Sequence, residues 1–228
     1  MKKQLLAALL ALPVLAAAQT PFTYTIKGKV GRLSAPAKIY LVRGLQPLDS
    51  ATLKNGEFTI RGTAEAPVAA QLVVRRQGRL GSMFGRISNR ASIFVEPGTL
   101  LVTSPDSLEN AAFKGGPVMT DHLRLQAAVA PIGARMVATT AQAQKATEAQ
   151  RNDPAFSQRI QAQLAALDKD MLQANYAFVR ANPHSWVSLD ALHGMRMWDP
   201  PQYATVAPLY EALSPELKAS PAGRDLRS

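Results

Sequence analysis

The sequence predicts an α+β protein with an amino-terminal antiparallel β-sandwich or barrel and a carboxy-terminal all-helical region. Short strand-like segments separated by turn residues fill the chain up to about residue 116. Asn55-Gly56, which favours a type I′ hairpin turn, lies between two of these segments. After Gly115-Gly116-Pro117 the apolar residues recur at helical spacing. We therefore expect a signal peptide over 1–18, a β domain over 19–116 and a helical region over 117–228.

The expected strands are short and bounded by turn residues. They cover residues 22–26, 38–42, 51–53, 58–60, 71–75, 92–96 and 100–103. Glu96-Pro97-Gly98 supplies the turn between the last two. Strands of this length at this spacing are typical of a sandwich or barrel.

The first expected helix follows the glycine pair. Thr120 can cap a helix that begins at Asp121, and Pro131 with Gly133 is expected to bend or end it. The following residues, 134–150, have fair helical propensity but a poor apolar face.

The clearest helix begins after Asp153, a capping residue, with Pro154 at its first position. Its apolar stripe comprises Phe156, Ile160, Leu164, Leu167, Met171 and Phe178. Asn182-Pro183 should stop it, because the residue before proline avoids the α region. Short helices are then expected after Ser185, Asp199 and Ser214.

The amino terminus has the pattern of a secretory signal peptide. Lys2 and Lys3 precede an apolar stretch from Leu5 to Leu15, and Ala16-Ala17-Ala18 offers small residues for cleavage before Gln19. The stretch is shorter than the roughly 20 apolar residues that a membrane span needs. We expect a periplasmic or secreted product without a transmembrane anchor.

The composition excludes several classes of function and suggests the charge of possible partners. The chain has 228 residues, a formal net charge of +10 and no cysteine, so disulfides, thiol nucleophiles and thiolate metal sites are excluded. The positive charge suits anionic partners, but no nucleic-acid-binding signature accompanies it and nucleic acid is not expected. A basic, solvated surface is the simpler and favoured explanation of the charge.

No catalytic pattern is present. His122, His184 and His193 lack the i, i+4 spacing of a helical metal site, and we expect them to be solvent-facing or capping residues. His193 follows Asp190 by three residues, which allows one carboxylate–imidazole contact. The Gly-x-Ser-x-Gly motif of hydrolases is absent. We expect no enzyme, no cofactor and no metal site.

One basic segment is a candidate partner-binding loop. Between Glu65 and Glu96 there is no acidic residue. The candidate residues there are Arg75, Arg76, Arg79, Met83, Phe84, Arg86 and Arg90. Arginines with an exposed apolar pair could bind an anionic surface or an envelope protein, although a soluble loop between two strands has the same composition. Trp186 and Trp198, by contrast, are expected to be core residues.

The order of several motifs resembles a known domain. Residues 22–28 resemble its opening F-x-I-x-G strand, and residues 38–41 and 49–62 resemble its next strands. Further motifs are residues 94–98, 113–115, 182–185 and 210–218. Together they resemble the amino-terminal domain of unknown function in exported thioredoxin-like proteins of the alkyl hydroperoxide reductase / thiol-specific antioxidant family. Residues 220–223 resemble the segment leading into that family's thioredoxin domain.

The resemblance implies a redox setting without redox chemistry, because the family's Cys-x-x-Cys pair has no counterpart here. The expected function is an exported, non-catalytic accessory or binding module associated with envelope thiol–disulfide redox proteins. Two alternatives remain open: a fragment of a thioredoxin-like oxidoreductase that needs its missing half, and a protein that binds polyanions or the envelope surface.

Overall fold

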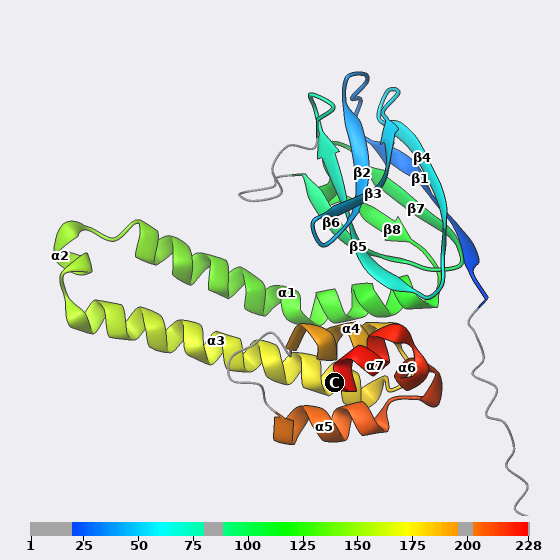
Figure 1. Cartoon of the computed structure of the whole chain (residues 1–228). Coiled ribbons are helices and arrows are strands. Elements are labelled where there is room, and N and C mark those ends of the chain that lie inside the picture. Colours follow the sequence, from blue (N-terminus) through cyan, green and yellow to red (C-terminus); the bar gives the residue numbers. More distant parts are fainter. Residues whose placement is uncertain (1–19, 80–88, 196–202, 228) are drawn as a thin grey trace, which may run out of the picture.

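A computed structural model of the chain describes residues 20–79, 89–195 and 203–227. The described residues form eight β-strands. Figure 1 shows the strands gathered in one half of the molecule and the helices in the other. The predicted architecture, a β-sandwich followed by a helical region, is confirmed. The predicted signal peptide, residues 1–18, lies outside the described residues.

One sheet, here called sheet A, has the strand order β4-β1-β7-β8. Its strands are β1 (Phe22–Val30), β4 (Glu57–Ala64), β7 (Gly98–Ser104) and β8 (Ala112–Lys114). β1 pairs antiparallel with β4 but parallel with β7, so the sheet is mixed where the sequence suggested a purely antiparallel arrangement. A short 3₁₀ turn, Leu108–Asn110, precedes β8.

The other sheet, sheet B, is antiparallel with the order β3-β2-β5-β6. Its strands are β2 (Lys38–Arg43), β3 (Gln46–Thr52), β5 (Val68–Arg75) and β6 (Arg90–Val95). The two sheets enclose an aliphatic core to which both contribute. Its fully buried members include Ile26, Ile39, Leu41, Ile60, Leu72, Ile93 and Val102.

The Asn55-Gly56 turn forms as predicted, with positive φ angles of 49° and 80°. Lys54 and Glu57 exchange both backbone hydrogen bonds across it, at 3.1 and 2.9 Å. The flanking strands then separate, because β3 pairs with β2 in sheet B and β4 pairs with β1 in sheet A. The turn therefore carries the chain from one sheet to the other.

The first helix, α1 (Pro117–Gln144), starts earlier than predicted, and at Pro131 and Gly133, where it was expected to bend or end, it bends. It begins at Pro117 instead of Asp121, because its first N–H groups bond to Glu96 and need no Thr120 cap. It also continues through Pro131 and Gly133. The missing N–H of Pro131 is accommodated as a bend along α1, which Figure 1 shows.

The second long helix, α3 (Pro154–Ala181), follows the prediction closely. Asp153 caps it by accepting a hydrogen bond from the Ala155 N–H at 2.9 Å, and Asn182 ends it. The short α2 (Glu148–Arg151) joins α1 to α3 through a capping box at Thr147. The three helices form a hairpin whose outer part, residues 126–171 and here called the arm, extends away from the sandwich (Figure 1).

Four shorter helices complete the chain: α4 (Trp186–Met195), α5 (Tyr203–Ala212), α6 (Pro215–Ala219) and α7 (Pro221–Arg227). They pack with the end of α3 around buried residues such as Tyr176, Leu192 and Leu217. The predicted Ser214 cap is present, and α7 was not predicted. The candidate helix start at Asp199 lies outside the described residues.

The helical half packs directly on the outer face of sheet B. Phe94 of β6 is 1% exposed and lies against Phe178 and Val187, with Trp186 beside them. The edge of β6 is also covered by α1: the Phe94 N–H lies 3.4 Å from the Met119 Sδ, and His122 Nε2 lies 3.2 Å from the Ser92 carbonyl oxygen. The edge that would otherwise invite strand pairing is thus occupied by the chain's own helix.

Candidate functional site

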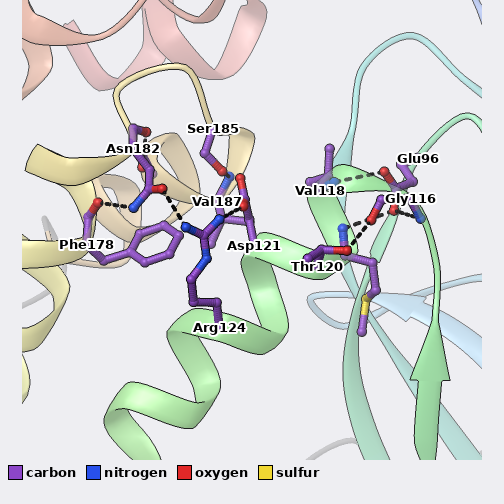
Figure 2. A network of polar contacts seen from close by, with 12 residues as sticks. Glu96, Gly116, Val118, Thr120, Asp121, Arg124, Phe178, Asn182, Ser185 and Val187 are labelled. Atoms are coloured by element: carbon purple, nitrogen blue, oxygen red, sulfur yellow. Dashed lines mark hydrogen bonds and ion pairs between the residues drawn. The ribbon is translucent and has the colours of Figure 1, made fainter.

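The helical half meets the sandwich through a capping carboxylate. Glu96, 7% exposed, accepts hydrogen bonds from the N–H groups of Gly116, Val118 and Met119 at 2.8, 3.0 and 3.0 Å. Figure 2 shows this carboxylate at the start of α1. The negative charge also complements the positive end of the helix.

The two glycines before α1 allow this approach. A Cβ at Gly116 would lie 2.7 Å from Glu96 Oε2, and one at Gly115 would lie 2.8 Å from the Met119 Cβ. The sequence shows these residues only as a domain boundary and Glu96 only as part of a turn. Nothing in their spacing reveals that a residue 20 positions earlier caps the helix.

A second polar cluster ties α1, α3 and α4 together (Figure 2). Arg124 pairs with Asp121 and donates to Asn182 Oδ1 at 3.1 Å, and its guanidinium lies 5.8 Å from the centre of the Phe178 ring. Ser188 Oγ donates to the Asn182 carbonyl at 2.7 Å. These contacts hold α4 against α1 and the end of α3.

A cleft of about 660 Å³ opens where these elements meet the sandwich, and we call it the junction cleft. Its apolar wall includes Tyr24, Leu48, Pro67, Phe94, Trp186 and Leu189. Its polar wall comprises Arg43, Thr63, Glu65, Asp190, His193, Ser220 and Asp225. A second cavity of about 570 Å³ shares Glu65, Pro67 and Trp186 with it. Both volumes are in the usual range for ligand pockets.

The charged groups of the cleft come from both halves. His193 Nε2 lies 3.6 Å from Asp225 Oδ2, which joins α4 to α7. Loss of water around the Asp190 carboxyl raises its pKa. The positive charges of the neighbouring His193 and Arg43 lower the pKa and so offset part of this rise. The Asp190 side chain remains open to solvent, so water moderates the rise.

Tyr24 is positioned by its cross-strand neighbour. It pairs with Gly62 across β1 and β4, and a Cβ at Gly62 would lie 2.4 Å from the Tyr24 hydroxyl oxygen. Glycine therefore makes room for the ring. Burial raises the pKa of the Tyr24 phenol, and the negative charge of Asp49 adds to this.

The cleft holds serine, histidine and carboxylate side chains, but its serine is committed to the fold. Ser220 is 2% exposed, donates to the Leu217 carbonyl at 2.7 Å and accepts from the Gly223 N–H at 3.0 Å. Its oxygen is thus held in the turn between α6 and α7. Within residues 20–79, 89–195 and 203–227, no group of three or more His, Asp or Glu side chains is arranged to hold a metal ion.

The predicted basic loop is placed only in part. Its flanking strands β5 and β6 are antiparallel neighbours, and Val73 faces Arg90. Arg76, Arg79 and Arg90 are exposed, and Arg75 is half-buried. Tyr40 Oη donates to the Gly78 carbonyl at 2.8 Å and anchors the start of the loop. Met83, Phe84 and Arg86 lie outside the described residues, so partner binding by this loop stays a prediction.

The three histidines have different environments. His184 and His193 are exposed, as expected. The expectation for His122 is wrong: it is 9% exposed, its ring lies 5.2 Å from that of Phe94, and its Nε2 donates to Ser92. Burial lowers the pKa of His122, and the Ser92 hydrogen bond opposes the shift.

The predicted core residue Trp186 is partly buried between two apolar clusters. Trp198 lies outside the described residues.

Residues 24–121 match the family model of a domain of unknown function (DUF4369). The matched segment runs from Tyr24 through the sandwich to Asp121, within the first turns of α1. It therefore includes both Glu96 and the N–H groups that it caps. No curated protein and no solved structure matches the chain. In the described ranges, no helix combines the length and hydrophobicity needed to cross a bilayer.

Proposed function

We propose that this protein is an exported, non-catalytic binding module that acts beside an envelope thiol–disulfide oxidoreductase and holds it through the junction cleft. The observation that carries the proposal is the cleft itself, which is built from both halves of the molecule. Its apolar wall offers area for burial, and its charged groups are few and convergent, as in recognition sites.

The charges of the cleft favour a basic partner segment. Among the described residues that line the cleft, Asp225 is engaged by His193, and the remaining carboxylates, Glu65 and Asp190, stand against one permanent cation, Arg43. A lysine or arginine of the partner would find complementary charge there, and its neighbouring apolar side chains would pack against Trp186 and Leu48.

The proposed redox partner is suggested by the motif resemblance, and the chain itself cannot supply the thiol chemistry. It has no cysteine and therefore no thiol of its own to oxidise. A module of this kind contributes by positioning a partner that carries the Cys-x-x-Cys pair. Export rests on the charged, apolar and small-residue zones that precede Gln19.

The test is in-cell crosslinking followed by purification of the full chain from the envelope. We expect wild-type protein to capture a protein that carries a Cys-x-x-Cys thioredoxin domain. Glu65→Gln with Asp190→Asn should lose it, because the cleft loses two charges. The matched control, Asp168→Asn with Asp170→Asn on α3, removes two carboxylates outside the cleft and should retain it. Equal capture by the cleft variant, or capture of proteins without that domain, would contradict the proposal.

Two further measurements address catalysis and export. The purified chain should not reduce insulin disulfides above background, and reduction would contradict the non-catalytic assignment.

When the chain is expressed with its own amino terminus, the periplasmic product should have the mass of a protein that begins at Gln19. An uncleaved product retained in the cytoplasm would contradict export.

A further inference from the structure

The outer face of sheet A is made mainly of threonine and basic residues. Because side chains alternate along a strand, the residues opposite the core all project to one side. On β1 and β4 these are Thr23, Thr25, Lys27, Lys29, Glu57, Thr59, Arg61 and Thr63. On β7 and β8 they are Thr99, Leu101, Thr103, Ala112 and Lys114. We call this set the threonine–lysine face.

This face is open and positively charged. All its members are exposed except Thr25, which is half-buried. It carries four cations and one acid, Glu57, whose carboxylate lies 3.6 Å from Lys29. Most of the protein's charge resides in this half, because residues 20–116 contain thirteen Lys or Arg and six Asp or Glu.

The strand register distributes the charges regularly. Lys27 and Lys114 both face Leu101, from β1 and β8, so they stand two strands apart, roughly 10 Å. Lys27 and Lys29 are two residues apart on one strand, roughly 7 Å. Arg61 faces Thr25 on the row before Lys27. The cations are thus spread across the sheet and are not clustered at a point.

Threonine hydroxyls fill the positions between the cations. Thr25 faces both Arg61 and Thr99, and Lys27 faces Thr59. Each hydroxyl can donate and accept a hydrogen bond. A ligand that lies across the strands would therefore meet alternating hydroxyls and cations.

We propose that the threonine–lysine face binds an extended polysaccharide that carries anionic groups. The cations complement carboxylates or phosphates on the polymer, and the hydroxyls complement its sugar hydroxyls. A membrane surface fits less well, because Leu101 is the one large apolar side chain among the residues of this face. Single-stranded nucleic acid would lack an aromatic side chain on which to stack. This inference does not rest on the junction cleft, with which the face shares only Thr63.

The test is binding of the full chain to immobilised polygalacturonate, measured at low and at physiological ionic strength. Lys27→Glu with Arg61→Glu should raise Kd at least tenfold. The matched control, Arg159→Glu with Lys169→Glu on α3, reverses an equal charge elsewhere and should bind as the wild type does. Arg76→Glu with Arg79→Glu tests the basic loop, the other candidate site for an anionic partner, and should raise Kd less than Lys27→Glu with Arg61→Glu does. Circular dichroism melting shows whether each variant is folded.

A second variant separates sugar recognition from simple charge attraction. Thr25→Val with Thr59→Val keeps strand propensity and charge but removes two hydroxyls. It should weaken binding to polygalacturonate several-fold and leave binding to polyglutamate, a carboxylated polymer without sugar hydroxyls, unchanged.

Three outcomes would overturn the proposal. The first is that the Lys27/Arg61 variant binds as tightly as the wild type. The second is that only the basic-loop variant loses binding. The third is that the wild type binds phosphatidylglycerol vesicles or polyglutamate at least as tightly as it binds polygalacturonate. Failure here would leave the junction cleft untouched, since none of the substituted residues lines it.

Discussion

The two sheets of the sandwich differ in how many of their faces are buried. Among the described residues, sheet A is covered on its core side and its other face is open, so its strands alternate between more buried and more exposed residues, as β1 does. Sheet B is covered on both sides at β5 and β6, by the core and by the helical half, and β5 has the consecutive buried residues Leu72, Val73 and Val74. The comparison teaches that a run of apolar residues in a strand marks a second covering layer.

The largest expected effect comes from removing the contact that covers sheet B. Phe94→Ala should cost about 4 kcal/mol of unfolding free energy, because it leaves a cavity against Phe178 and Val187. Leu101→Ala, an outward position of sheet A that is 38% exposed, should cost under about 1 kcal/mol. Denaturant unfolding measures both. Equal losses would mean that the two faces are not differently buried.

Glu96→Ala should follow, at about 3 kcal/mol, because it leaves three N–H groups at the start of α1 without their acceptor. Glu96→Gln retains one acceptor oxygen and should recover part of the loss. The same denaturant measurement applies. A cost below about 0.5 kcal/mol for Glu96→Ala would show that the helix does not depend on this carboxylate.

The arm should respond locally. Ile160 belongs to a small cluster with Phe156 and Ala146 near the end of the arm, so Ile160→Ala should cost about 2 kcal/mol there. Amide hydrogen exchange in residues 126–171 should accelerate by about 30-fold, and exchange in the sandwich should not change. Acceleration throughout the protein would indicate that the arm and the sandwich unfold together.

The smallest effect concerns pH and the covered edge of sheet B. Because the pKa of His122 is lowered on folding, the unfolded chain takes up a proton more readily than the folded one. The stabilisation is complete above the ordinary histidine value of 6.5 and is lost as pH falls from there toward the lower folded pKa. His122→Gln keeps a donor for Ser92 without titrating, so its stability should fall less over this range. Asp190 is common to both proteins and cancels in the comparison. Parallel pH profiles would argue against the assignment.

The fold was largely predictable because its signals are local. Asn55-Gly56 and Asp153-Pro154 determine their turn and helix start through their own backbone preferences, and the structure confirms both. The start of α1 was not predictable, since its cap comes from Glu96 on a preceding turn. The apolar run in β5 is consistent with helices packing on sheet B. It could be interpreted in this way only after the structure showed which face of the sheet the helices cover.

The candidate sites were predictable to different degrees. Asp190 and His193 share a helix, so their proximity follows from spacing, but Arg43 and Asp225 reach the junction cleft only through the tertiary fold. The threonine–lysine face depends on the register of four strands, and sequence alternation alone does not order those strands.

The capping of α1 by Glu96 has a consequence for the order of assembly. A ribosome delivers Glu96 twenty residues before the first N–H that it binds, so the sandwich carries a ready acceptor when the next segment emerges. The β half can then act as a template on which the first helical turn nucleates, the step that is most costly for an isolated helix. A protein cut between residues 116 and 117 would separate this helix from its nucleation site, so the helical half is best expressed together with its sandwich.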